Sequence, residues 1–222
     1  MADIYAINIK DDITEIQIKH LLTIISEEKK QKIEKFRFKE DFLRSLYGDI
    51  LARKLIANRI GIKSKNIKFY QNLNGKPYVF GKAGVYFNIS HSKDWVVCVI
   101  SKYECGIDIE KIKNIDMSIA ERFFSKNEYK TLLYKKGKEQ IELFYDLWTL
   151  KESYIKWKGK GFSIPLNSFE FIKKENSFNI VGPHNGKIFF KQFFIDDNYK
   201  LSVCMEENKC ELHIINIMQF KY

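Results

Sequence analysis

Two carboxylates lie two residues apart in the segment Gly106-Ile107-Asp108-Ile109-Glu110. The alternation of apolar and acidic residues predicts a short strand that points both carboxylates to one face. Two like charges held on one face favour the binding of a cation, and carboxylate oxygens are ligands that Mg²⁺ prefers. The alternative is an exposed sheet face on which Asp108 and Glu110 pair with lysines such as Lys111.

A third carboxylate lies on a helix that we predict further along the chain. Trp148, Glu152 and Lys156 follow one another at intervals of four residues and so share one helix face. If Glu152 lies beside the acidic strand, it would complete a Mg²⁺ site made only of oxygen ligands, with open positions for water and a substrate phosphate. Lys156 could reach the same phosphate. The alternative is a surface ion pair, because Glu before Lys at this spacing stabilises exposed helices.

The segment Asn88-Ile89-Ser90-His91-Ser92 ends a predicted strand with small polar residues around a histidine. Backbone N–H groups, Ser90 and the imidazole of His91 could bind a phosphate there. The alternative is a polar hairpin turn with a structural histidine. Lys29 and Lys32 share a helix face and could bind another phosphate, although a solvated lysine face explains them equally simply.

Glu128 is a further acid with two open interpretations. The segment Ser125-Lys-Asn-Glu128 matches the capping box, in which a glutamate bonds back to the N–H of the residue that caps the helix. Glu128 is also a candidate catalytic acid or base. The pattern does not decide between these roles.

The elements that must position these residues fall into two similar series. Each series runs from a strand through helices to antiparallel strands, and the break lies near Tyr103. The longest predicted helices cover residues 38–59 and 139–158. We therefore predict an α+β fold, a pseudo-dimer of two lobes that each pack helices on an antiparallel sheet. The N-terminal lobe covers residues 1–103, the C-terminal lobe covers residues 104–222 with most of the metal site, and a ligand cleft lies between them.

Composition narrows the class of protein. The 222 residues contain 38 Lys and Arg against 28 Asp and Glu, a net charge of +10. The segment 29–68 alone contains 13 basic and 4 acidic residues, a net charge of +9, which favours an anionic partner. The four cysteines form no C-x-x-C pair, which argues against zinc and for reduced thiols. No apolar run approaches the roughly 18 residues of a membrane span, and the N-terminus does not resemble a signal peptide, so we expect a cytoplasmic protein.

Taken together, several ordered motifs resemble those of the 4′-phosphopantetheinyl transferases of the surfactin-synthetase-activating type. The resemblance runs from about Tyr5 to Met205. Its motifs are Gly75-Lys76-Pro77, Phe87-Asn88-Ile89-Ser90-His91-Ser92, Gly106-Ile107-Asp108-Ile109-Glu110, Arg122-Phe123-Phe124-Ser125, Trp148-Thr-Leu-Lys151-Glu152-Ser153-Tyr154-Ile155-Lys156, Gly159-Lys160-Gly161 and Pro165-Leu166.

The resemblance implies that the phosphopantetheine arm of coenzyme A is transferred to a serine of an apo acyl or peptidyl carrier protein, with release of adenosine 3′,5′-bisphosphate. By this likeness, the Mg²⁺ ligands would be Asp108, Glu110 and Glu152. The phosphates would be bound by Ser90, His91 and Lys156. Near the nucleotide would lie Lys76 and Pro77, and at the phosphate end Lys29, Lys32, Arg44 and Ser45. Relatives of this length act as monomers.

The serine proton needs an acceptor, for which Glu152, Glu128 and a metal-bound water are the candidates. Two other functions fit parts of the pattern. A Mg²⁺-dependent phosphodiesterase or nuclease would use the same carboxylates, and a basic adaptor would use only the positive charge. Only five of the basic residues are arginines and no aromatic stacking motif accompanies them, so we expect no nucleic-acid partner and no membrane partner.

Overall fold

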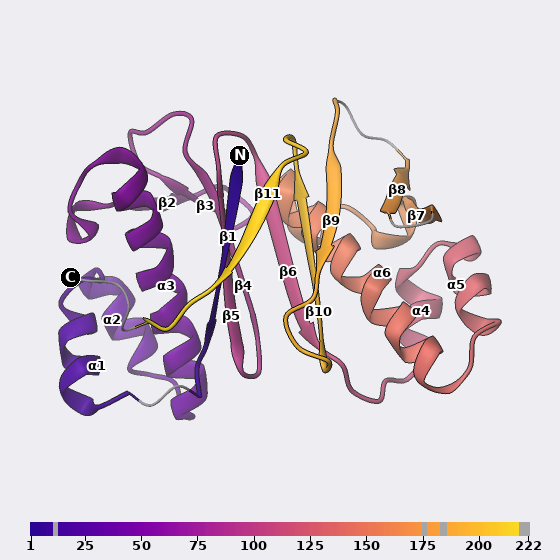
Figure 1. The fold of residues 1–222 in the computed structure, drawn as a ribbon, viewed down its shortest axis with the longest axis horizontal. Helices are drawn as coiled ribbons and strands as arrows, with labels where there is room; N and C mark the ends of the chain where they lie inside the picture. The colour runs from indigo at the N-terminus through magenta and orange to yellow at the C-terminus, as the bar shows by residue number, and fades with distance from the viewer. Residues whose placement is uncertain (11–12, 175–176, 183–185, 218–222) are drawn as a thin grey trace.

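The computed structural model describes residues 1–10, 13–174, 177–182 and 186–217. Two sheets lie in the middle of the molecule, with α1, α2 and α3 on one side and α4, α5 and α6 on the other (Figure 1). No helix in these residues is both long and apolar enough to cross a membrane. The predicted α+β architecture of two helix-covered sheets is confirmed.

The first sheet has the strand order β11-β1-β5-β4. Its strands are β1 (Ala2–Asn8), β4 (Tyr86–Ser92), β5 (Trp95–Ser101) and β11 (Cys210–Ile214). The neighbours β1, β5 and β4 run antiparallel, whereas β11 runs parallel to β1 with Ala2 opposite Cys210. A small hairpin of β2 (Phe69–Gln71) and β3 (Pro77–Val79) lies beside it.

Three helices cover the first sheet: α1 (Glu15–Leu22), α2 (Glu27–Ile33) and α3 (Lys39–Ile60). Thr14 and Gln17 form a capping box at the start of α1, and Ser26 caps α2 by accepting from the N–H of Lys29. The apolar stripe of α3 packs on the sheet, and the helix ends at Gly61, whose φ of 70° favours glycine. A 3₁₀ turn, η1 (Ser64–Asn66), follows.

The second sheet has the strand order β6-β10-β9 and is antiparallel throughout. Its strands are β6 (Cys105–Lys111), β9 (Phe189–Phe193) and β10 (Tyr199–Met205), and its helices are α4 (Ser118–Phe123), α5 (Lys126–Leu133) and α6 (Gly137–Lys158). Two 3₁₀ turns and a hairpin follow α6: η2 (Gly161–Ser163), η3 (Leu166–Ser168), β7 (Glu170–Lys174) and β8 (Ser177–Val181).

The two sheets share a core that belongs to neither lobe alone. Ile4 and Val97 of the first sheet meet Ile107 and Leu201 of the second in one buried cluster. Separate clusters lie under α3 and under α6. The central cluster holds the two lobes against each other.

One local prediction and one open alternative differ from the structure. The last strand, β11, joins the sheet of the N-terminal lobe, so the expected C-terminal lobe of residues 104–222 does not keep its own last strand. The polar segment at residues 90–92 is not a turn, because β4 continues through Ser92. The turn lies at Lys93, where φ is +48°.

Candidate active site

Helix α6 lies directly on the backbone of β6 at Gly106. A Cβ atom at this position would stand 2.1 Å from the carbonyl oxygen of Ser153 and 2.3 Å from the amide nitrogen of Trp157. Only glycine allows so close an approach of helix and strand. This contact sets Glu152 and Lys156 of α6 against the acidic residues of β6.

Lys156 forms the central ion pair of the site. Its Nζ lies 2.6 Å from Oδ1 of Asp108 and 3.0 Å from Oγ of Ser90. Ser90 in turn donates to the same Asp108 oxygen at 2.9 Å. The site therefore joins β4 of the first sheet to β6 and α6 of the other lobe.

The three carboxylates repel one another. Burial, together with the charges of Asp108 and Glu110, raises the pKa of Glu152 to about 7. Burial also raises the pKa of Asp108, although Lys156 and Ser90 oppose this, and burial and the Asp108 charge raise the pKa of Glu110. One lysine thus does not balance the negative charge of the cluster.

The carboxylate cluster has unused oxygens that suit a hard cation. Oδ2 of Asp108 and Oε1 of Glu152 are buried without a hydrogen-bond partner among the described residues. Within the same residues, no three His, Cys, Asp or Glu side chains are placed so that they could hold a metal ion together as they stand, and Lys156 is the cation that contacts Asp108. Oxygen donors of this kind fit Mg²⁺, which keeps several ligand positions for water and phosphate.

A cleft of about 430 Å³ opens beside these residues. Its walls come from both lobes: Asn74, Gly75, Lys76, Pro77 and Asn88 from one, and Glu152, Ile155, Lys156, Gly159, Lys160, Gly161 and Ser163 from the other. The predicted cleft between the lobes therefore exists and contains Glu152 and Lys156. It has the size of a small-molecule site.

His91 lies exposed on β4 at the rim of the site, near the cations Arg44 and Lys156. Packing around the ring lowers its pKa, and the charges of Arg44 and Lys156 lower it further. Arg44 is held by an ion pair with Asp41 and by a hydrogen bond to the carbonyl of Lys93 at 2.7 Å. The structure thus brings Arg44 of α3 to the same rim as His91 and Lys156, an arrangement suited to an anion.

Comparisons with known proteins agree with this geometry. The model of the 4′-phosphopantetheinyl transferase superfamily matches residues 104–204, and the model of the 4′-phosphopantetheinyl transferase N-terminal region matches residues 12–103. The 4′-phosphopantetheinyl transferase ffp of Bacillus subtilis is 40% identical over 203 residues, which cover 90% of this chain and 91% of the relative. The chain belongs to the 4′-phosphopantetheinyl transferase superfamily.

Further relatives show the same similarity. Sfp of Bacillus subtilis (strain 168) is 39% identical over 90% of this chain and 91% of its own, and gsp of Aneurinibacillus migulanus is 40% identical over 92% and 86%. The protein is therefore an enzyme that transfers a 4′-phosphopantetheinyl group. This finding does not favour the alternatives of a nuclease or a basic adaptor.

Other expected site residues of the transferase lie at different distances from the carboxylates. Lys29 and Lys32 lie on α2, and burial lowers the pKa of Lys29, while Asp49 and Arg53 are among the charges that act on it. The charges that mainly act on Lys29 are those of Asp49, Lys32 and Arg53, which lie on α2 and α3. Ser45 is half-buried on α3, next to Arg44.

Lys76 of the transferase contacts the other lobe as well as the cleft. Its buried Nζ donates to Oε2 of Glu104 at 2.6 Å and to the carbonyls of Trp157 and Cys105 at 2.9 and 3.1 Å. Asn72 of the same hairpin donates to the carbonyl of Gly159 at 2.7 Å. These donors cap the C-terminal carbonyls of α6, where a positive charge is favourable.

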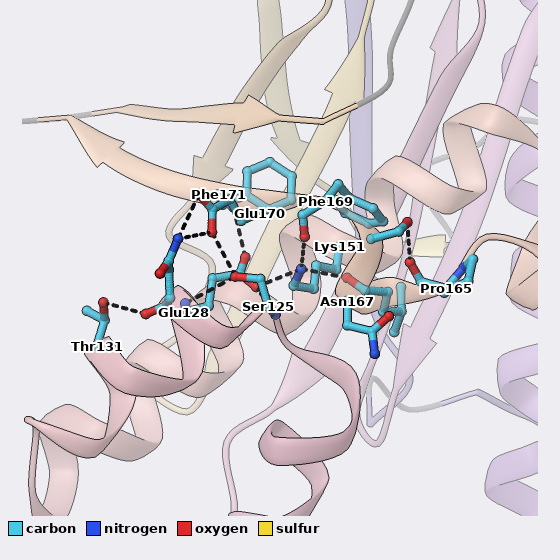
Figure 2. A network of polar contacts seen from close by, with 12 residues as sticks. Ser125, Glu128, Thr131, Lys151, Pro165, Asn167, Phe169, Glu170 and Phe171 are labelled. Carbon is cyan, nitrogen blue, oxygen red and sulfur yellow. Dashed lines mark hydrogen bonds and ion pairs between the residues drawn. The ribbon is translucent and has the colours of Figure 1, made fainter.

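Glu128 is not among the described residues that line this cleft, and its contacts support the capping role. Both oxygens are engaged: Oε2 accepts from the N–H of Ser125 and pairs with Lys151, each at 2.8 Å, and Oε1 accepts from the N–H of Phe171 at 2.8 Å. Figure 2 shows this network between α5, α6 and the segment that leads into β7. The capping-box prediction is confirmed, and the pair with Lys151 was not predicted.

Two further residues of the site had no predicted role. Asn88 lines the cleft, and Ser92 donates to Oε2 of Glu110 at 2.8 Å. Each lies two residues from Ser90 on β4, in the same way that Asp108 and Glu110 lie two residues apart on β6. This shared period of two was visible in the sequence, but the pairing of the two segments was not.

Proposed function

We propose that this enzyme transfers the 4′-phosphopantetheine arm of coenzyme A to a serine hydroxyl of an apo acyl or peptidyl carrier protein. The observation that carries the proposal is the group of carboxylates formed by buried Asp108 and half-buried Glu110 and Glu152, which lies with Lys156 and Ser90 at a cleft between two lobes. Such a cluster suits a polyphosphate substrate whose negative charge arrives with a metal ion. One chain supplies both lobes, which supports action as a monomer.

The residues are proposed to divide the substrate between them. Asp108, Glu110 and Glu152 would hold Mg²⁺, which when bound would neutralise the charge of the diphosphate. The phosphates would meet Ser90, His91 and Lys156, and the nucleotide would lie near Lys76 and Pro77. Further phosphate contacts would come from Lys29, Lys32, Arg44 and Ser45.

The reaction exchanges one P–O bond for another. The serine oxygen forms a bond to the β-phosphorus of coenzyme A, and the bond from this phosphorus to the bridging oxygen breaks, so adenosine 3′,5′-bisphosphate leaves. Lys156 and His91 stabilise the charge of the leaving phosphate. The serine proton goes to Glu152, because Oε1 of Glu152 has no hydrogen-bond partner among the described residues, whereas both oxygens of Glu128 are engaged.

Intact mass spectrometry tests the proposal. The protein is incubated with coenzyme A, Mg²⁺ and apo carriers from fatty-acid, polyketide and peptide synthetases. We expect the carrier to gain the mass of one phosphopantetheine, and carriers with the acceptor serine changed to alanine to gain none. Absence of any mass gain across all carriers would contradict the proposal.

A further inference from the structure

The edge strands β4 and β6 belong to different sheets and meet through side chains. Three side chains that alternate along β4 accept from three N–H groups that alternate along β6. Asn88 Oδ1 accepts from Ile107 at 3.0 Å, Ser90 Oγ from Ile109 at 3.4 Å, and Ser92 Oγ from Lys111 at 3.1 Å. We call these three contacts the polar seam.

The two serines of the polar seam make a second bond each, to a carboxylate of the site. Ser90 donates to Oδ1 of Asp108 at 2.9 Å, and Ser92 donates to Oε2 of Glu110 at 2.8 Å. A hydroxyl has one hydrogen to donate and can accept as well, so each serine uses both functions. Each serine therefore orients one carboxylate while it is itself fixed by the next backbone N–H of β6.

The carboxylate of Glu110 depends on such a donor. Glu110 is half-buried at the end of β6, and the negative charge of Asp108, two residues away on the same face, repels it. A flexible glutamate under this repulsion turns towards water unless a hydrogen bond holds it. Ser92 is the side chain that supplies this hydrogen bond.

Resting on the proposed Mg²⁺-dependent transfer, we propose that Ser92 is a positioning residue that holds Glu110 in the orientation in which it binds the metal ion. Ser90 has a mixed role, because Lys156 also donates to it. A substitution at Ser92 therefore tests the orientation of a metal-binding carboxylate separately from the binding of the substrate phosphate. Partners that orient metal ligands typically change metal affinity by about 10-fold to 100-fold when removed.

The chain offers a matched control on β5. Ser101 donates to Oε1 of Glu207 at 2.6 Å and accepts from the N–H of Tyr103 at 3.0 Å, so it makes the same two kinds of bond as Ser92. Glu207 pairs with the N-terminal amine and is not part of the cleft. Ser101→Ala thus removes the same type of contact from a place without a metal-binding carboxylate.

The test measures metal binding directly. Free Mn²⁺, which shares the preference of Mg²⁺ for oxygen ligands, is titrated by electron paramagnetic resonance in the presence of coenzyme A. For Ser92→Ala we expect the dissociation constant for Mn²⁺ and the half-saturating Mg²⁺ concentration for transfer to rise about 10-fold. We expect Ser92→Thr, which keeps the hydroxyl, to stay within about 3-fold of the wild type, and Ser101→Ala to bind Mn²⁺ as the wild type does.

The outcomes separate this inference from the proposed function. If the wild-type protein binds Mn²⁺ and modifies a carrier while Ser92→Ala binds Mn²⁺ equally well, the positioning role is overturned and the proposed function stands. If the wild-type protein neither binds Mn²⁺ with coenzyme A nor modifies any carrier, both fail. Should Ser92→Ala not fold, Ser92→Cys keeps the shape with a weaker donor, and wild-type affinity in that variant overturns the role equally.

Discussion

At the scale of single residues, Glu152 combines function with a cost in stability. Its pKa is about 7 in the folded protein against 4.5 for an ordinary glutamate, so folding disfavours its ionised form. Below about pH 4.5 the Glu152 carboxyl is protonated in both the folded and the unfolded protein, so its ionisation does not change the free energy of unfolding. Between pH 4.5 and 7 it lowers the stability of the metal-free protein progressively, and above pH 7 the loss is complete.

We expect Glu152→Gln to abolish transfer and to stabilise the metal-free protein at pH 8. The gain should be on the order of 2 kcal/mol at pH 8, because the neutral amide removes a charge that burial disfavours and that Asp108 and Glu110 repel, and it should vanish near pH 4.5. Urea unfolding in the presence of a chelator at both pH values measures it. Glu139→Gln on the exposed face of α6 is the control. If Glu152→Gln is less stable than the wild-type protein at pH 8, the explanation by burial and charge repulsion is contradicted.

Glu128 differs from Glu152, because its contacts stabilise the fold. Lys151 is fully buried and pairs with Glu128, while its Nζ also donates to the carbonyls of Leu166 and Phe169 at 2.8 and 2.7 Å. Glu128→Gln should cost about 3 kcal/mol, because it leaves a buried ammonium without its counter-charge. Urea unfolding measures the loss, and transfer by the folded protein should stay near the wild-type rate. A 100-fold slower transfer at unchanged stability would restore Glu128 as the base.

At the scale of elements, the contact of α6 with β6 sets the geometry of the site. Gly106→Ala should unfold the protein or destabilise it by at least about 4 kcal/mol, because its Cβ would overlap the backbone of α6 at Ser153 and Trp157. Thermal unfolding and the yield of soluble protein measure this. Gly48→Ala is the matched control: its Cβ would lie 3.2 Å from a side-chain methyl of Ile89, and alanine favours the helix, so we expect a change within about 1 kcal/mol.

Local sequence signals predicted the helices and strands well, because these elements depend on hydrophobic periodicity and on capping and terminating residues that act within a few positions. Helices α3 and α6 begin and end within two residues of the predicted bounds, and glycines terminate both. The segment at residues 90–92 was harder, since serine and histidine favour turns in isolation. Its backbone stays in β4 by pairing with β5, where Ser92 lies opposite Trp95. Ser90 and Ser92 also find side-chain partners on β6, a contact that no local pattern encodes.

At the scale of the whole molecule, the two lobes depend on each other for their core. The central cluster takes Ile4 and Val97 from one lobe and Ile107 and Leu201 from the other, and Lys76 joins the lobes at the end of α6. Each lobe alone would expose its half of this cluster to water.

We therefore expect fragments 1–103 and 104–222 to remain unfolded or aggregate when each is produced alone, and to give folded protein when produced together. Dispersion of amide signals in NMR spectra and circular dichroism measure the outcome. The full-length chain, unfolded and refolded under the same conditions, is the control. A cooperative unfolding transition in either isolated fragment would show that its lobe has sufficient core of its own.

The site as a whole could be predicted only in part. The residue types and spacings of Asp108, Glu110, Glu152 and Lys156 indicated a metal and phosphate site, because each pair shares one face of one element. The pairing of Lys156 with Asp108, the bond from Ser92 to Glu110 and the buried pair of Glu128 with Lys151 join different elements. Contacts of this kind follow from the packing of the lobes and have no signature in a single sequence.

The parallel pairing of β11 with β1 also constrains how the chain can fold during synthesis. Ala2 pairs with Cys210, about 200 residues later, so one edge of β1 has no partner until β11 has been made. Until then the N-terminal sheet presents an open strand edge to neighbouring nascent chains. The complete native sheet therefore forms only once β11 has been made, rather than lobe by lobe, and the open edge of β1 is the place where a stalled or truncated chain would associate with another.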